Sequence, residues 1–197
     1  MLSHPDSLFQ LPQLVLASAS PRRAEILAAV GWPFVKDVPE IDESELPDES
    51  PDEYVVRLAK AKASVIGSKR PAELILGADT TVVVEGRIIG KPADAPEAAE
   101  MLRLLSGRWH SVLTGIAVAR GDSLEVGVQS TRVKFSELSE AEIDFLIRYG
   151  EPLDKAGAYA VQAQAALFIE SIEGDYWNVV GLPVNLLYET IRRIFNA

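Results

Sequence analysis

Apolar residues recur along this chain at spacings that alternate between those of strands and those of helices. A short apolar run at residues 14–17 predicts a buried strand, and small residues at 18–20 lead from it into a helix. Ser20 suits the N-cap of that helix, and Pro21 suits its first turn, where a missing N–H costs little. We therefore predict a strand, a tight turn and a helix in immediate succession.

The rest of the pattern predicts a mixed succession of helices and strands. Capping boxes begin at Ser50 and Ser139, and turns at Glu85-Gly86 and Gly121-Asp122 join paired apolar runs. Helices are expected at residues 24–30, 50–67, 96–105, 139–149 and from Pro183 onward, and strands at 32–38, 73–78, 81–84, 88–89, 109–119, 124–135, 166–171 and 176–180. In the helix at 50–67, the apolar spacing places Lys62 beside or away from the buried face, which is formed by Tyr54, Leu58, Ala61 and Val65.

Hairpins occur in this succession together with helical crossovers. This order predicts an α/β (mixed α+β) fold with a bent mixed sheet, divided into two lobes. A doubly wound parallel sheet is the alternative, but it needs a regular alternation that the middle of the chain lacks. No linker separates independent units, so residues 1–197 are expected to form a single domain.

Composition narrows the classes of function. Hydrophobic residues make up 48% and charged residues 24% of the 197 positions, which is typical of a globular protein. There are no cysteines and only two histidines, His4 and His110, so thiolate and histidine zinc sites are disfavoured. The formal net charge of -10 disfavours nucleic-acid partners and anionic membranes. No apolar run is long enough for a membrane span or a signal peptide, so we expect a cytoplasmic protein.

The turn at residues 18–20 is a candidate anion site. Small side chains expose backbone N–H groups, the helix start adds partial positive charge, and Arg22 and Arg23 add two guanidinium groups suited to phosphate oxygens. Arginines are unfavourable at a helix N-terminus, which points to a function other than helix stability. The alternative is that both arginines are merely solvated.

Carboxylates and lysines elsewhere could complete such a site. Asp79 ends an apolar run, so its carboxylate could accept a proton or hold a divalent cation at the rim of a sheet; it could also be an ordinary turn or cap residue. Glu43, in an otherwise solvated acidic loop at residues 39–49, could be a second ligand of the cation. Lys62 and Lys91 could bind phosphates or remain surface charges. The chain has no GxxxxGK[ST] or GxSxG motif, so a P-loop enzyme and a serine hydrolase are disfavoured.

Seven segments together resemble one family. In order they read LASASPRRAEIL, EIDESE, YVVRLAKAKA, LGADTTVVVEGRIIGKP, AAEMLRLLSGRWHSVLTGIAV, EPLDKAGAY and VVGLP. They resemble the Maf family of nucleotide pyrophosphatases over residues 14–194. The SxSPRR and GADT…KP elements are the specific ones.

The resemblance implies a fold similar to that of inosine triphosphate pyrophosphatases, with a deep cleft between two lobes. It implies hydrolysis of a nucleoside triphosphate to the monophosphate and diphosphate, with a divalent cation, Mg2+ or Mn2+. By position, Asp79 matches the family's catalytic proton acceptor, and Glu43 and Asp79 match its metal site. The substrate-binding positions are matched by Ser18, Arg22, Arg23, Lys62, Thr80, Lys91 and Gln162.

The resemblance also bears on the base. Arg23, Thr80 and Gln162 resemble the branch that acts on dTTP and UTP, with CTP or modified pyrimidine nucleotides as further candidates, rather than the branch that acts on 7-methyl-GTP. A glutamine amide offers one donor and one acceptor to the imide edge of uracil or thymine. Ala163 and Ala165 stand where many members have glycine, so we expect a turn of different shape there.

A second hypothesis is a non-catalytic regulator of cell division that senses nucleotides, because the family's name is linked to septum formation. Hydrolysis of a nucleotide panel would separate it from the first. The expected partner is a small nucleoside triphosphate, with no nucleic acid and no membrane. The sequence leaves a homodimer open.

Overall fold

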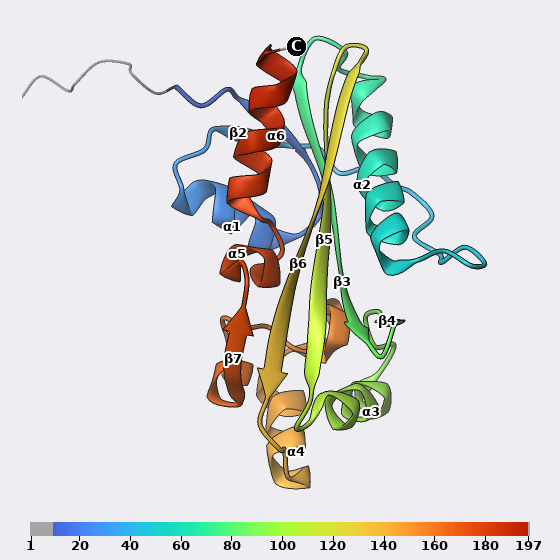
Figure 1. Ribbon diagram of the computed structural model, residues 1–197, viewed down its shortest axis with the longest axis vertical. Helices are drawn as coiled ribbons and strands as arrows, with labels where there is room; N and C mark the ends of the chain where they lie inside the picture. Colours follow the sequence, from blue (N-terminus) through green and yellow to red (C-terminus); the bar gives the residue numbers. More distant parts are fainter. Residues whose placement is uncertain (1–9, 197) are drawn as a thin grey trace, which may run out of the picture.

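Three long strands run the length of the molecule: β3 (Leu74–Val84), β5 (Trp109–Arg120) and β6 (Ser123–Phe135) (Figure 1). The computed structural model describes residues 10–196, so His4 lies outside the described residues. The seven-stranded sheet has the order β2-β1-β3-β5-β6-β7, and β4 also pairs with β3. The short strands are β1 (Leu14–Ala17), β2 (Phe34–Lys36), β4 (Arg87–Ile89) and β7 (Ile169–Glu173).

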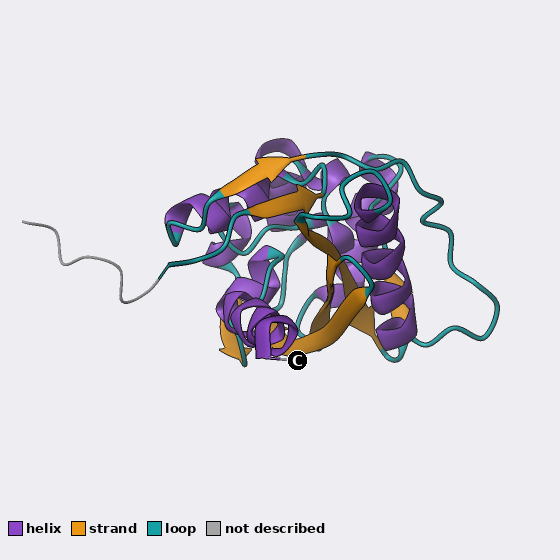
Figure 2. Cartoon of the chain, turned by 90° about the horizontal axis from the view of Figure 1, so that it is seen from above, coloured by secondary structure: helices purple, strands orange, loops and turns teal. Residues whose placement is uncertain are grey.

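Helices lie on both sides of this twisted sheet (Figure 2). They are α1 (Pro21–Ala29), α2 (Pro51–Gly67), α3 (Ala95–Leu105), α4 (Glu140–Tyr149), α5 (Tyr176–Val180) and α6 (Val184–Asn196). Short 3-10 turns at Pro152–Asp154, Ala156–Ala158 and Gln164–Leu167 form most of the irregular segment between α4 and β7. No helix within residues 10–196 is long and apolar enough to cross a membrane.

The sheet is shared by two lobes. At one end of the long strands, α1, α5 and α6 pack on one face and α2 on the other. At the other end, α3 and α4 pack on a separate core that includes Phe135. The predicted bent, mixed, two-lobed sheet is thus confirmed, and it is not a doubly wound parallel sheet, because only β1 pairs in parallel, with β2 and β3.

Strand β3 changes neighbours between the lobes. On its outer side it pairs with β1 over Leu74 to Gly77 and with β4 over Val82 to Val84. Residues 78–81 have no strand partner on that side within the described chain. The sheet therefore opens at Asp79 and Thr80, in the middle of β3. The expectation that Asp79 ends its strand is wrong, because Val82, Val83 and Val84 prolong the strand beyond it.

One predicted strand is a helix. Residues 176–180 form α5, although their aromatic and β-branched side chains are typical of a strand. Asp175 caps this helix by accepting a hydrogen bond from the Trp177 amide at 2.8 Å. Gly181, with φ 129°, ends it. The cap and the terminating glycine thus decided the structure of these five residues, which is too short a segment for periodicity to identify.

Other boundaries shifted by a few residues. The strand predicted at 32–38 shortens to β2, and the strand predicted at 166–171 begins only at Ile169, after a 3-10 turn. Both capping boxes and the hairpin of β5 and β6 form as predicted.

The buried face of α2 is rotated relative to the prediction. Val55, Ala59 and Ala63 are fully buried, and Lys62 is only 8% exposed. The placement of Lys62 beside or away from the buried face is therefore wrong. Alanines are only weakly apolar, and Lys62 lies among them, so the sequence does not mark this face as the buried one. Their small side chains nevertheless allow the closest approach to the sheet.

Two glycines in the sheet set the distance of α2. A Cβ added at Gly77 would lie 2.1 Å from the carbonyl oxygen of Ala59, and one at Gly115 would lie 2.5 Å from that of Val55. Such distances are far inside van der Waals contact. The α2 backbone therefore rests directly on β3 and β5, because these two positions carry no side chain.

We predict that Gly77→Ala destabilises the protein by about 3 kcal/mol, because backbone atoms of α2 must move to admit the methyl group. Urea unfolding would measure the change in the free energy of unfolding. Gly67→Ala is the control, since a Cβ there has an ordinary 3.9 Å contact with Ile75. Equal stability of both variants would contradict this account of the packing.

Candidate functional site

A cleft of about 520 Å³ opens where β3 changes neighbours. Its walls come from the turn after β1, the middle of β3, α2, the acidic loop, the segment after β4 and residues 154–162. The candidate residues of the sequence analysis all line it: Ser18, Arg22, Arg23, Glu43, Lys62, Asp79, Thr80, Lys91 and Gln162. The fold thus brings together side chains that are separated by up to 144 positions along the chain.

The turn between β1 and α1 faces this cleft. Ser20 makes no side-chain cap; instead its amide donates to Ser18 Oγ at 3.2 Å. Pro21 begins α1, and the first turn of the helix contains no acidic residue. The first helical N–H groups are therefore not neutralised locally by a carboxylate, as an anion site requires.

Arg23 is anchored within the protein. It is 7% exposed, and its guanidinium donates from Nε to Gly181 O, from Nη1 to Ser18 Oγ and from Nη2 to Thr80 Oγ1, each at 2.9 Å. Burial lowers the pKa of Arg23, and the charge of Asp79 opposes that effect. Three of its five N–H groups are thus used to join α1, β3 and the loop after α5.

Lys62 lies between two carboxylates. Its Nζ is 2.6 Å from Asp79 Oδ1 and 2.6 Å from Glu43 Oε1. The Lys62 and Asp79 side chains are 10% and 11% exposed, whereas Glu43 is 45% exposed at the mouth of the cleft. Burial acts to raise the pKa of Glu43, but the hydrogen bond and charge of Lys62 outweigh it, so this pKa is lowered. Lys62 is thus the shared cationic partner of both carboxylates.

The two carboxylates fit one mode of metal binding. Glu43 and Asp79 converge on the same atom, Lys62 Nζ, so their oxygens face a common point. No group of three or more His, Cys, Asp or Glu side chains within residues 10–196 is placed to hold a metal by itself. Mg2+ is commonly held by one or two carboxylates together with substrate phosphates and water. The donor set therefore fits a cation that binds with a phosphate substrate.

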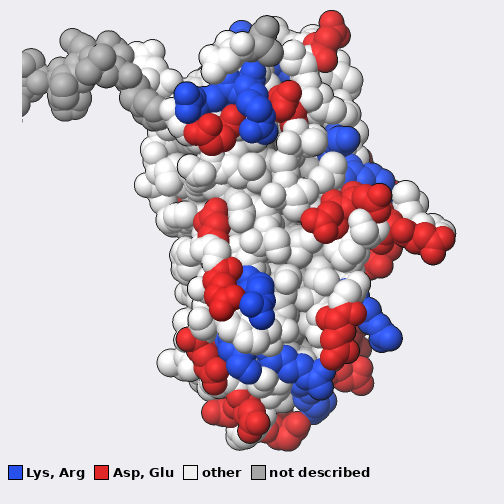
Figure 3. All heavy atoms as spheres, viewed as in Figure 1, with Lys and Arg blue, Asp and Glu red and all other residues white. Residues whose placement is uncertain are grey.

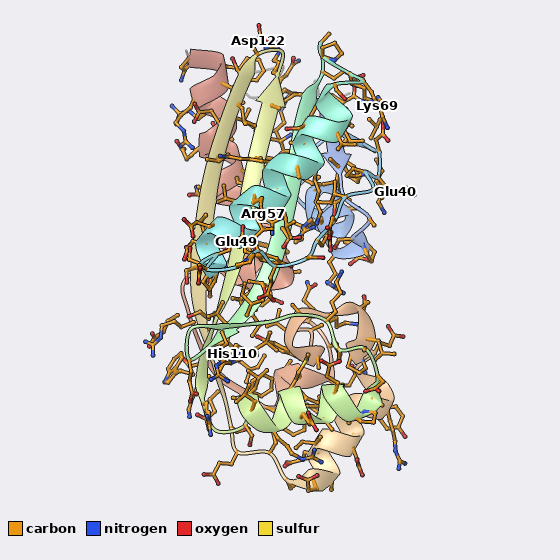
Figure 4. The ribbon with its side chains drawn as sticks, turned by 90° about the vertical axis from the view of Figure 1, so that its right-hand side faces the viewer. Glu40, Glu49, Arg57, Lys69, His110 and Asp122 are labelled. Carbon is orange, nitrogen blue, oxygen red and sulfur yellow. The ribbon has the colours of Figure 1, made fainter. Side chains whose placement is uncertain are left out.

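The acidic loop is held more firmly than a solvated connection would be. Arg57 of α2 donates to both carboxylate oxygens of Glu49, at 2.6 and 2.8 Å, and to Ser44 O at 2.9 Å. Figure 4 shows Arg57 and Glu49 next to each other on this side of the molecule. Tyr54 donates to Glu43 O at 3.0 Å, and burial raises the pKa of Tyr54 to about 12. These contacts hold Glu43 beside the cleft.

A contact that the sequence analysis missed crosses the cleft. Arg22 donates from Nη1 to Asp154 Oδ2 at 3.0 Å, and Lys155 Nζ binds Asp154 Oδ1 at 2.6 Å. Arg22 is therefore held on one lobe by a carboxylate of the other. The segment EPLDKAGAY contributed only to the resemblance, because nothing in its spacing indicates which residue faces Asp154.

Gln162 and Lys91 line the cleft without partners. Neither side chain makes a hydrogen bond or ion pair with the part of the chain that the structure describes, so both can reach a ligand. Ala163 has φ -123°, and Ala165 is buried in a 3-10 turn without a positive φ. The turn after Gln162 thus avoids the backbone conformation that would require glycine.

His110 anchors the segment that carries Gln162. His110 Nε2 lies 2.7 Å from the hydroxyl of Tyr159, and its ring stacks on Phe135 with centroids 5.6 Å apart. Figure 4 shows His110 in the lobe away from α2. Burial lowers the pKa of His110 to about 4 and raises that of Tyr159. His110 is therefore neutral in the folded protein and packs as a core residue.

Fold and site together define an α/β protein with a cleft in which cationic side chains surround a buried carboxylate. The family model described as "Maf-like protein" matches residues 13–194, and the chain belongs to the Maf family. A dTTP/UTP pyrophosphatase of Symbiobacterium thermophilum is 53% identical over 175 residues, which cover 89% of this chain and 90% of that protein. A dTTP/UTP pyrophosphatase of Bacillus cereus is 44% identical, with 92% of this chain and 95% of that protein covered.

Among solved structures, the chain is similar to a nucleoside-triphosphatase / dITP/XTP pyrophosphatase of Mycobacterium abscessus. The two are 16% identical with a TM-score of 0.44, and the alignment covers 79% of this chain and 93% of that one.

We predict that wild-type protein loses stability between pH 6.5 and about 4, by up to about 3 kcal/mol, through His110. The folded pKa is lowered, so the unfolded chain takes up the proton first and the stabilisation present above pH 6.5 is lost on acidification. Urea unfolding of wild type and His110→Gln across this range would measure it. The difference between the two proteins reports His110 alone, and parallel pH profiles would contradict the prediction.

Proposed function

We propose that this protein hydrolyses nucleoside triphosphates to the nucleoside monophosphate and diphosphate, with dTTP and UTP as preferred substrates. The observation that carries the proposal is the Lys62–Asp79 pair at 2.6 Å on the floor of a cleft whose mouth holds Arg22 and Lys91. The names of the two relatives support the same reaction and the same bases.

The overall charge restricts where a triphosphate can bind. The chain has a formal net charge of -10, and on the face in Figure 3 basic and acidic side chains lie side by side without forming one basic field. A triphosphate is therefore attracted only where cations converge. Arg22, Lys62 and Lys91 all line one cleft, next to the N-terminus of α1.

In the proposed reaction, a water oxygen attacks the α-phosphorus of the triphosphate. The bond between this phosphorus and the oxygen that bridges to the β-phosphorus breaks. The electron pair of that bond leaves with the diphosphate, and the proton of the water passes to the carboxylate of Asp79. A divalent cation would neutralise phosphate charge and acidify water, and Glu43 and Asp79 would hold it. Lys62 donates to Asp79 Oδ1 and so orients this carboxylate before the substrate binds.

In this scheme Arg22 exchanges its contact with Asp154 for a contact with a phosphate of the substrate. A phosphate group competes with Asp154 for the same guanidinium, and a phosphate carries more charge than one carboxylate. Binding of substrate would thus release Asp154 while retaining Arg22. Lys91 can add charge without breaking an existing contact.

Base preference is proposed from Gln162. Its amide is exposed in the cleft and presents one acceptor and a donor group, which match the N–H and a carbonyl of an imide edge. The presence of nucleoside triphosphates in the cytoplasm makes that compartment the proposed location.

A nucleotide panel with Mg2+ tests the reaction. We expect wild type to release diphosphate, not single phosphate, and to prefer dTTP and UTP over purine nucleotides and 7-methyl-GTP. Ion chromatography of the products would measure both. Nucleotide binding without turnover for any metal would instead favour a regulator that senses nucleotides.

We predict that Asp79→Asn lowers kcat at least 100-fold, because an amide cannot accept the proton, while nucleotide affinity changes less than tenfold. Steady-state kinetics and calorimetric titration would separate the two effects. Asp144→Asn, on the exposed face of α4, is the control and should keep the wild-type rate. An Asp79→Asn protein with undiminished kcat would rule out this residue as the base.

A further inference from the structure

A row of hydroxyl groups leads from the cleft into the sheet. Thr80, which lines the cleft, lies 2.9 Å from the hydroxyl of Thr114 on β5. Thr114 donates in turn to the main-chain oxygen of Asn178 in α5, at 3.2 Å. Thr114 and Asn178 are both fully buried. At the end of the row that lies in the cleft, Arg23 donates to Thr80 Oγ1.

Asn178, at the buried end of this row, is held in place by further hydrogen bonds. Asn178 donates from Nδ2 to Val112 O at 2.9 Å and to Thr131 Oγ1 at 3.0 Å. Thr131 Oγ1 in turn exchanges two hydrogen bonds of 3.1 Å with the main chain of Asp175, the cap of α5. The short helix is thereby fixed to β5 and β6, and the carbonyl of Asn178 has a defined position.

The carbonyl of Asn178 needs the proton of Thr114. The two amides that could reach it within the helix, those of Gly181 and Leu182, both donate to Trp177 O instead. A buried carbonyl without a donor is costly, so the Thr114 hydroxyl is directed toward Asn178. The hydrogen bond between the two threonines must then be donated by Thr80.

Counting protons leaves Thr80 as an acceptor. A hydroxyl has one proton and two acceptor positions. The proton of Thr80 is used by Thr114, and one acceptor position is used by Arg23. The other nearby acceptor, Gly181 O, is farther away at 3.4 Å and already receives Arg23 Nε. What Thr80 can offer a ligand is therefore one lone pair.

We propose that Thr114 is a positioning residue that keeps Thr80 as a hydrogen-bond acceptor, so that Thr80 binds an N–H or O–H of the nucleoside and not a phosphate. This inference rests on the proposed function. Ionised phosphate oxygens are acceptors and gain nothing from a second acceptor. The N–H and O–H donors of a nucleoside triphosphate lie on its base and its ribose. The phosphates then lie toward Arg22 and Lys91, and the nucleoside toward Thr80.

The test compares UTP with two analogues that each lack one donor. These are 3-methyl-UTP, which lacks the base N–H, and 3′-deoxy-UTP, which lacks the ribose 3′-OH; the 2′-OH is not a candidate, because dTTP lacks it and is a proposed substrate. We expect wild type to disfavour the analogue that lacks the donor to Thr80 about five- to thirty-fold in kcat/KM, mainly through KM, as the loss of one hydrogen bond predicts. The analogue whose penalty is lost in Thr80→Val identifies this donor, since a penalty that arises at Gln162 would remain.

Thr114→Val keeps the shape of the side chain but removes the hydroxyl, so Thr80 is free to rotate. We expect the discrimination to fall at least fivefold in this variant and to return in Thr114→Ser. In a Thr80→Val background, which has no acceptor, Thr114→Val should change the discrimination no further. Thr190→Val, at a buried threonine that bonds within α6, is the matched control and should discriminate as wild type does.

Unchanged discrimination in Thr114→Val, or an equal effect of it in the Thr80→Val background, would overturn the inference. If Thr114→Val does not fold, Thr114→Ala replaces it with the same expected outcomes. If wild type releases diphosphate and Thr114→Val discriminates between UTP and its analogues as wild type does, only the positioning role of Thr114 is contradicted. Wild type that releases no diphosphate contradicts the proposed function and this inference with it.

Discussion

The contact between Lys62 and Asp79 is the interaction on which the cleft depends. A buried charge is costly unless it is paired, and Lys62, at about one-tenth exposure, is paired with both Asp79 and Glu43. The contact exists because α2 lies directly on β3 and β5, where Gly77 and Gly115 have no side chains. Packing of backbone against backbone thus determines the position of a charge.

The opening of the sheet gives that charge access to a ligand. Strand β3 is continuous through both lobes, but its outer neighbour changes from β1 to β4 around Asp79 and Thr80. Residues on an uncovered strand edge can face a cavity while the strand itself stays rigid. A carboxylate held on such a strand needs no flexible loop to position it.

The cations of the cleft differ in how they are held. Arg23 is bound by three protein acceptors and maintains the structure of the cleft wall. Arg22 is held by the exposed carboxylate and the main-chain oxygen of Asp154, which an anion can replace, and Lys91 is not held by a described residue. The cations therefore range from fixed to available, and the available ones lie at the one place where the proposed triphosphate would bind.

Much of the fold was predictable from sequence because local rules decide it: capping boxes at Ser50 and Ser139 began helices, and the hairpin of β5 and β6 followed from its turn. The candidate residues, found by motif and resemblance, all proved to line one cleft. Helix α5 was missed because five residues are too few for periodicity to identify, although its cap and its terminating glycine are local. The burial of Lys62 and the bond of Arg22 to Asp154 were decided only by tertiary structure. Periodicity reports the average environment of a helix face or strand, whereas these two features depend on which distant backbone or side chain lies beside it.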